Sequence, residues 1–197
     1  HTLISDKIDL RTAATYSWGK SEVLLDGTSS QNSSQWRNLE TVNGSNRPDL
    51  SISDFDAGHR IIANSTFEFK WTDKIKTRLG FFYEGAEGEP FSYVVRGSGL
   101  LSDTGSNSAL IYVPANQAEA NEVIENSDYL RSRRGQFAER NADRSDWSHI
   151  IDLKFAQEFG INFGGNKVHK FEFTFDIFNF TNLLNKDWGV RPFTSNN

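Results

Sequence analysis

Two acidic residues in this chain are spaced like ligands of a metal-binding loop. Asp54 and Asp56 precede Gly58 in SISDFDAG, and carboxylates at positions i and i+2 before a glycine partly match a calcium-binding loop. An EF-hand loop also needs further oxygen ligands and a glutamate at its twelfth position, which residues 60–67 do not supply. We therefore interpret the pair as turn residues ahead of a strand, and we keep both carboxylates as candidates for substrate contact.

Other catalytic and metal-binding patterns are missing from the sequence. His59, His149 and His169 are isolated, without the HxH or HExxH spacing of metal sites. There is no GxSxG turn, and the GSG at 97–99 lacks the following helix that a phosphate-binding loop requires. The sequence has no cysteine, which excludes disulfides and thiolate metal sites. We expect no enzymatic activity and no cofactor.

A dense group of charges lies in RRGQFAERNADR, residues 133–144, where arginines are interspersed with Glu139 and Asp143. Two interpretations of this group stay open: paired charges that anchor or gate a loop, or a solvated surface. The nearby acidic residues and the overall net charge of −5 argue against a nucleic-acid partner.

The elements that would position these residues are strands. The clearest one lies within 168–180, where large apolar residues alternate with polar ones in KFEFTFDI. Side chains alternate across a strand, so one face is apolar and the other polar. About 10 residues of this kind can cross a bilayer as a tilted strand. The same period of two predicts further strands near 7–18, 59–71, 74–85 and 147–159.

The connections between these strands alternate in length. Segments 19–58 and 87–146 are long and polar, whereas 72–73 and 160–167 are short turns. If neighbouring strands are antiparallel, both long loops fall on one side, as in outer-membrane barrels. Within the second loop, 118–131 has helix-compatible composition and 91–96 could form a strand.

Composition agrees with a membrane barrel. Only 37% of the residues are hydrophobic, yet 16 residues are phenylalanine. This combination suits a barrel wall with one apolar face and one face in contact with water. No apolar stretch approaches the roughly 18 residues of a transmembrane helix. The predicted fold class is all-β: an antiparallel transmembrane β-barrel segment of about five strands with long extracellular loops.

Several blocks of the sequence resemble the C-terminal barrel region of Bacteroidetes TonB-dependent outer-membrane receptors, and the Oar-like group in particular. The blocks are SDFDAGHRIIANSTFEF, IYVPANQAE, YLRSRRGQFAERNADRSDWSHIIDLKFAQEF and FEFTFDIFNFTNLLNKDWG, which together cover roughly residues 50–190. RGQFAERN and DIFNFTNLLNKDWG are the specific ones, whereas the alternation elsewhere is generic.

This resemblance implies a barrel of about 22 strands around an N-terminal plug, in the bacterial outer membrane. It also implies that the inner-membrane TonB system drives uptake of a substrate. These residues include no plug and no TonB box, and the sequence starts at His1 without any methionine, so we expect a segment of a longer receptor. The expected partners are outer-membrane lipid, the rest of the barrel and plug, the TonB system and other surface proteins.

The strand pattern and this resemblance together predict whether each candidate residue faces lipid, the membrane interface, the lumen or an external loop. The expected lipid-facing side chains are Phe67, Phe69, Leu79, Phe81, Leu153, Phe155, Phe171, Phe173, Phe175 and Ile177. The expected interfacial belt is Trp18, Trp71, Tyr83, Trp147 and Phe159. The expected lumen-facing side chains are Glu68, Arg78, Glu172, Thr174 and Asp176. The loop candidates for substrate or partner contact are Asp54, Asp56, Tyr93, Arg96, Tyr112 and Tyr129.

Two alternatives to a transporter stay open at this point. The same barrel could be an adhesion or assembly platform whose external loops bind partner proteins. The chain could also be a secreted β-sandwich that binds carbohydrate by stacking sugars on its aromatic residues, although the unequal loops and the phenylalanine ridge argue against this.

Overall fold

The computed structural model describes residues 2–95, 108–116, 122–164 and 167–192, and these residues are mostly β-structure. Among them, none of the helices is long and apolar enough to span a membrane. The chain divides into two compact units. The sheet unit comprises His1–Trp18, His59–Ala86 and Trp147–Arg191, and the connection unit comprises Gly19–Gly58 and Glu87–Asp146. Each is described by itself below.

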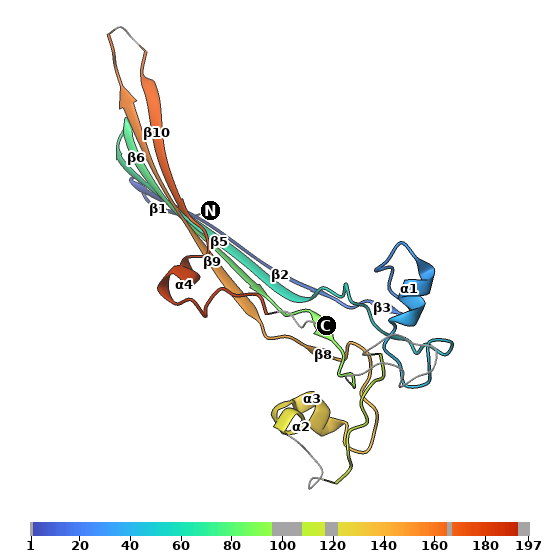
Figure 1. Ribbon diagram of the computed structural model, residues 1–197. Coiled ribbons are helices and arrows are strands. Elements are labelled where there is room, and N and C mark those ends of the chain that lie inside the picture. The colour runs from blue at the N-terminus through green and yellow to red at the C-terminus, as the bar shows by residue number, and fades with distance from the viewer. Residues whose placement is uncertain (1, 96–107, 117–121, 165–166, 193–197) are drawn as a thin grey trace. The chain divides into compact units, whose positions relative to one another are not determined.

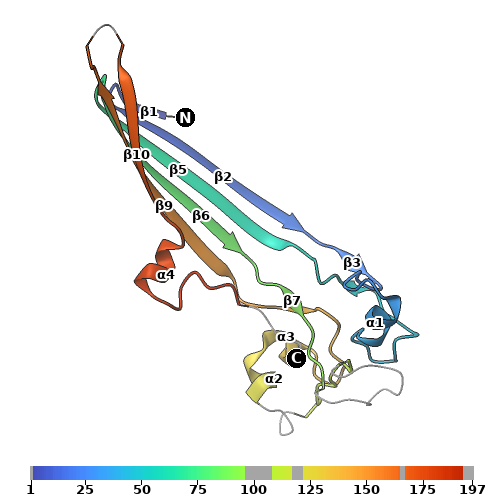
Figure 2. The same ribbon diagram turned by 45° about the horizontal axis from the view of Figure 1, so that its top comes forward.

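The sheet unit is built on a six-stranded sheet in the order β1-β2-β5-β6-β9-β10 (Figures 1 and 2). The strands are β1 (Thr2–Ser5), β2 (Ile8–Gly19), β5 (Gly58–Thr72), β6 (Ile75–Ala86), β9 (Ser148–Ile161) and β10 (His169–Ile177). The pairs β5–β6, β6–β9 and β9–β10 are antiparallel. Strand β1 was not predicted, because four residues are too few to show a period of two.

The short and long connections leave the sheet at opposite ends. Residues 73–74 join β5 to β6 and residues 162–168 join β9 to β10, whereas the long segments follow β2 and β6 and return at β5 and β9. Since neighbouring strands are antiparallel, both long segments leave from the same end, as the alternating loop lengths predict.

The strand register gathers the apolar residues on one face of the sheet. Phe67 lies opposite Leu79, which lies opposite Phe155, which in turn lies opposite Phe175. Directly opposed residues point to the same side, so these form one row across four strands. Every other predicted lipid-facing side chain lies an even number of residues along its strand from this row. All of them therefore share this one face, here called the apolar face.

The other face is charged. Arg78 forms ion pairs with Glu158 at 3.4 Å and with Glu172, and Lys154 lies 3.2 Å from Asp176. Glu68 is opposite Arg78 in the register, and Thr174 lies between Glu172 and Asp176 on the same strand. All the predicted lumen-facing residues therefore share this face, here called the charged face.

The last predicted strand is shorter than expected. The prediction of strand over 178–180 was wrong, because β10 ends at Ile177 and helix α4 (Phe180–Leu184) follows. Between them Asn179 adopts a left-handed backbone conformation with φ 53° and ψ 52°, which a strand cannot contain. Its backbone N–H donates to the Asp152 carboxylate at 2.7 Å and its side-chain amide donates to the Gly189 carbonyl at 3.0 Å. These local hydrogen bonds override the apolar pattern.

The connection unit contains short strands and helices, and two of its helices lie where the sequence has helix-compatible composition, at 118–131. It contains the strand pairs β3 (Glu22–Val23) with β4 (Ser51–Ile52) and β7 (Pro90–Phe91) with β8 (Asp143–Arg144). Its helices are α1 (Asn32–Arg37), α2 (Glu122–Asn126) and α3 (Asp128–Ser132).

A small core holds the second long connection together. Val113 and Leu130 are fully buried, and Ile124 and Ala138 pack with them. The sequence predicted only a helix-compatible composition for 118–131, which contains Ile124 and Leu130. It did not show that Val113 and Ala138 complete a core, because these residues are scattered through polar sequence.

Replacing Leu130 by alanine should destabilise the connection unit by about 2–5 kcal/mol, since the side chain is fully buried and its loss leaves a cavity. Val123→Ala is the matched control: Val123 is 57% exposed, and its truncation should change stability by at most about 0.5 kcal/mol. Hydrogen exchange of the Val113 and Ala138 amides, which bond to Gln136 and Ile111 carbonyls, reports this unit directly. Equal protection in both variants would contradict the assigned core.

Candidate functional site

Residues of the RGQFAERNADR stretch hold the two long connections together. The Arg140 Nη1 and Nη2 atoms donate to the Leu24 and Val23 carbonyls at 3.1 and 2.8 Å. The Asn141 amide donates to the Ile52 carbonyl at 2.9 Å and to the Asp54 carboxylate at 2.6 Å. Segment 19–58 is therefore bound to segment 87–146 through side chains that lie side by side in the sequence.

An ion pair between Arg144 and Asp56 completes this junction. The Asp56 carboxylate also accepts from the backbone N–H of Ser21 and, at 3.1 Å, from that of Gly58. Gly58 has φ 57°, and a Cβ atom there would lie 2.4 Å from the Glu87 carboxylate. Asp54 and Asp56 thus act in a turn and a junction, where both Asp56 carboxylate oxygens and one Asp54 oxygen accept internal hydrogen bonds.

The other arginines of the stretch act locally. Arg133 lies 3.2 Å from Glu139 and donates to the Phe137 carbonyl at 3.0 Å, while Arg134 pairs with Glu125. Of the two interpretations of this charged group, anchoring is the one that its contacts within the connection unit support.

Two of the tyrosine candidates are part of the scaffold. Tyr93 and Tyr129 stack with ring centroids 6.2 Å apart, and the Tyr93 hydroxyl donates to Asp143 at 2.8 Å. Burial, with the Asp143 carboxylate adding to it, raises the pKa of Tyr93 to about 12. Burial likewise raises the pKa of Tyr129, whose hydroxyl accepts from the Glu139 N–H at 2.7 Å. Both phenols therefore stay protonated near neutral pH.

Tyr112 is the remaining loop candidate that the structure describes, since Arg96 lies outside the described residues. It is 51% exposed and makes an edge-to-face contact with Phe137, with ring centroids 5.2 Å apart. This pair forms an exposed aromatic surface on the connection unit.

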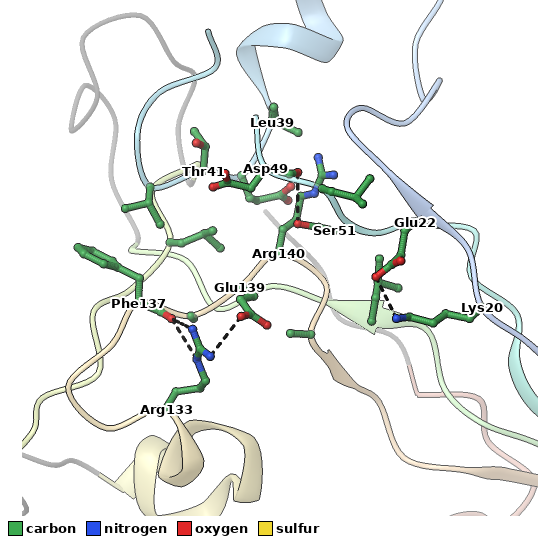
Figure 3. A pocket seen from close by; sticks show the side chains of 17 residues that line it. Lys20, Glu22, Leu39, Thr41, Asp49, Ser51, Arg133, Phe137, Glu139 and Arg140 are labelled. Atoms are coloured by element: carbon green, nitrogen blue, oxygen red, sulfur yellow. Dashed lines mark hydrogen bonds and ion pairs between the residues drawn. The ribbon is translucent and has the colours of Figure 1, made fainter. Parts of the chain in front are cut away.

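Phe137 also lines a cavity of about 420 Å³ within the connection unit (Figure 3). Its walls come from both long connections, which the junction at Arg140 brings together. The lining residues are Lys20, Glu22, Leu39, Glu40, Thr41, Val42, Asp49, Leu50, Ser51, Ile52, Leu110, Arg133, Phe137, Ala138, Glu139, Arg140 and Ala142. No sequence pattern predicted this cavity, although the arginine-rich stretch contributes Arg133 and Arg140 to its wall.

Most cations of the cavity wall are already neutralised. Lys20 lies 2.9 Å from Glu22, and Arg133 lies 3.2 Å from Glu139. Arg140 differs: it is only 4% exposed, and its Nη atoms bond to neutral carbonyls. Its Nε atom is buried and has no hydrogen-bond partner among the described residues. A buried guanidinium N–H without an acceptor destabilises the folded state.

Glu40 adds a titratable group to the same cavity. Burial raises the pKa of its carboxyl, the charges of Asp54 and Asp26 add to this, and the nearby Arg140 opposes it. The result is a carboxyl group that is harder to ionise than one in water.

An aromatic and histidine belt is the second candidate surface, on the apolar face of the sheet unit. The rings form a continuous chain with centroids 5.9–6.5 Å apart: Tyr16 and Trp18 against His59, His59 against Trp147, Trp147 against His149, and His149 against Tyr83. The Tyr16 and Tyr83 hydroxyls lie 2.6 and 2.8 Å from the Nδ1 atoms of His59 and His149.

Sequence reasoning predicted only part of this belt. Trp18, Tyr83 and Trp147 were expected there, while Tyr16, His59 and His149 were missed. The sequence did contain a signal for them, because each lies an even number of residues from an apolar residue of its strand and so faces the same side. Trp71 and Phe159 lie near the short turns, where Trp71 stacks on Phe69 at 6.0 Å.

Comparison with protein-family models, curated proteins and solved structures gives no match for this chain. Among the described residues, no group of three or more histidine, aspartate or glutamate side chains could hold a metal ion.

Glu40→Gln should remove a pH-dependent loss of stability in the connection unit. A carboxyl whose pKa is raised in the folded state binds its proton more tightly there than in the unfolded chain. Stability therefore falls as pH rises above the ordinary value of 4.5 toward the folded-state pKa. Relative to wild type, the variant should gain stability between pH 4 and pH 7. Urea unfolding across this range measures the change, and parallel pH profiles for the two proteins would contradict it.

Proposed function

We propose that this chain is part of an outer-membrane β-barrel receptor of the TonB-dependent type, which mediates energised uptake of a substrate. The observation that carries the proposal is the sheet with one continuous apolar face and one charged face, bounded by an aromatic belt. In this proposal lipid contacts the apolar face, and the charged face lines the lumen or contacts the plug.

Strand length supports a membrane span. Strands β5, β6 and β9 contain 15, 12 and 14 residues. A tilted transmembrane strand needs about 9–11 residues. At about 3.3 Å per residue, even twelve residues extend about 40 Å, which is enough to cross the hydrocarbon layer at the usual tilt.

Polar atoms on the apolar face are bonded to one another. The Trp71 Nε1–H donates to the Thr77 hydroxyl at 2.8 Å, which donates to the Gln157 side-chain oxygen at 2.6 Å. The Gln157 amide donates onward to the Lys76 carbonyl at 3.0 Å. Hydrocarbon offers no hydrogen bonds, so an unsatisfied group there costs several kcal/mol. Each donor in this series of hydrogen bonds has an acceptor, which is what polar side chains in contact with lipid require.

The large apolar side chains are uncovered within the sheet unit. Phe171, Phe173 and Phe175 are 50%, 60% and 55% exposed. A contiguous apolar surface of this kind marks a contact with a membrane or another protein. The belt of indole, phenol and imidazole rings at one end of the face has the composition of a membrane–water interface.

The sheet also has two edges, at β1 and β10, whose backbone groups need partners. A closed barrel removes such edges. We propose that the remaining strands of a barrel of about 22 strands pair with them, as the resemblance implies. The connection unit then lies on the external side, and the plug and TonB contacts come from the rest of the receptor.

An adhesion or assembly platform is the second candidate function. The connection unit favours it, because the long connections fold into a compact body with its own core and could present a fixed surface to a partner protein. A secreted β-sandwich would need a second long sheet on the apolar face. The other strands of the described residues are only two residues long, which counts against this alternative.

Phe175→Arg should impair insertion, because arginine on the lipid face near the bilayer midplane costs about 2–4 kcal/mol. Thr174→Arg is the matched control: it adds the same charge one residue away on the charged face, beside Glu172 and Asp176, and should have little effect. Urea titration of the full-length receptor folded in phosphatidylcholine vesicles measures the difference, since the edges at β1 and β10 need their neighbouring strands. Equal losses in both variants, or a full-length wild-type protein that stays in the aqueous phase without detergent, would overturn the membrane assignment.

A transport role and a platform role differ in their need for energy. In cells that produce the full-length receptor, substrate uptake should stop when a protonophore dissipates the inner-membrane gradient. Partner binding that persists unchanged, with no substrate accumulation at any stage, would favour the platform.

A further inference from the structure

We propose that the end of the sheet unit that carries the short connections is a contact surface for anionic phospholipid headgroups, which its lysines bind at the membrane surface. This inference rests on the proposed membrane span and adds to it a preference for one class of lipid.

Each short connection of the sheet carries an exposed lysine. Lys7 lies between β1 and β2, Lys74 between β5 and β6, and Lys167 between β9 and β10. Backbone hydrogen bonds hold the first two connections against neighbouring strands. The Lys70 N–H donates to the Lys7 carbonyl at 2.8 Å, and the Gly160 N–H donates to the Lys74 carbonyl at 2.6 Å. The three connections lie at the same end of the sheet (Figures 1 and 2).

The strands add positive charge at this end. Lys70 and Lys76 are directly opposite each other in the register of β5 and β6, on the charged face. Like charges in opposed positions destabilise a sheet. Lys76 is also opposite Glu158, but that carboxylate already lies 3.0 Å from Lys170 and 3.4 Å from Arg78. The two opposed lysines therefore have little negative charge beside them, and an anion bound at this end would reduce their repulsion.

Acidic residues at this end are too few to neutralise it. Segments 6–7, 70–76 and 158–170, here called the basic end, contain six lysines and only three acidic residues, which are Asp6, Asp73 and Glu158. Among the described residues, no ion pair involves Lys7, Lys70, Lys74 or Lys167. The whole chain has a net charge of −5, so this positive charge is local and attracts anions to one end of the sheet.

Aromatic rings beside these lysines indicate that the anions belong to a membrane. Trp71 is 61% exposed and Phe163 is 70% exposed. Phe163 packs edge-to-face on His169 and Phe171 of β10, with ring centroids 5.6 and 6.1 Å apart. Lysine together with exposed tryptophan and phenylalanine is typical of a segment at a membrane–water interface. An acidic protein would use the lysines but would leave these rings in water.

The headgroup chemistry matches lysine. A phosphodiester oxygen accepts charge-assisted hydrogen bonds from an ammonium group. Lysine side chains at a membrane surface extend their ammonium groups into the headgroup layer, and each one adds to the attraction toward anionic lipid. The three lysines of the connections are placed to make these contacts, because they lie beyond the ends of the strands.

Photo-cross-linking of the full-length receptor in vesicles tests the lipid preference. The vesicles contain phosphatidylcholine with about 30% phosphatidylglycerol, and the probe is either lipid with a photoactivatable headgroup. We expect the phosphatidylglycerol probe to label segments 70–76 and 158–170 at least about threefold more than the phosphatidylcholine probe. Sodium chloride at about 0.5 M should remove most of this difference. Equal labelling by the two probes, or a preference that salt does not change, would overturn the proposal.

Variants locate the contact at the basic end. The triple variant Lys7→Gln, Lys74→Gln and Lys167→Gln should lose the preference and still fold, since all three side chains are exposed. The control is the triple variant Lys20→Gln, Lys154→Gln and Lys186→Gln, which removes the same charge outside the basic end and should keep the preference. Loss of the preference in both triple variants, or in neither, would overturn the assignment to this end.

Competition distinguishes a lipid from other anions. Inorganic phosphate and polyglutamate are each compared with sodium chloride at equal ionic strength, and neither should displace the phosphatidylglycerol probe more than the salt does. Specific displacement by phosphate would indicate a site for a free anion. Specific displacement by polyglutamate would indicate an acidic protein partner. Either result would overturn the proposal.

Failure of this proposal and failure of the receptor function are distinguishable. Insertion of the full-length receptor with equal labelling by both probes would remove only the lipid preference. A receptor that inserts neither into phosphatidylcholine vesicles nor into the mixed vesicles would remove the membrane function, and this inference with it.

Discussion

The antiparallel register of β5, β6, β9 and β10 is the constraint on which the two faces of the sheet depend. Phe67, Leu79, Phe155 and Phe175 form one row only because each strand is aligned to within a single residue of its neighbour. A slip of one residue in any strand would move its phenylalanines among the ion pairs of Arg78 and Lys154. The ladder thus creates the apolar face, and the membrane proposal rests on that face.

The connection unit depends on a different kind of contact. Its strand pairs are two residues long, and further backbone hydrogen bonds join Thr41 of the first connection to Ser108 and Leu110 of the second. Side chains add to these bonds: Arg144 pairs with Asp56, Asn141 bonds to Asp54, and Arg140 bonds to two carbonyls of the first connection. The same arginine that closes this junction also lines the cavity.

The sequence blocks that resemble outer-membrane receptors have structural roles here. SDFDAG and RGQFAERN meet in the connection unit through Asp54 and Asn141. The FNFTNLLNKDWG block folds on itself, with Asn179 bonded to Gly189 and the Asn182 amide bonded to the Lys186 and Trp188 carbonyls. These blocks therefore describe how a scaffold is held together.

The sequence by itself determined the five long strands and which face of each is apolar, because a period of two is a local property of neighbouring residues. The lengths of the segments between these strands then determined which connections are long and which are short. It also determined which residues share a face, including Glu68 and Arg78 on one side and Phe67 and Leu79 on the other. Only the tertiary structure decided that the long connections form a unit, that Asp56 is occupied by Arg144, and that Arg140 retains a buried donor. These contacts join residues up to 117 positions apart, and no local pattern specifies which distant side chain will accept a hydrogen bond.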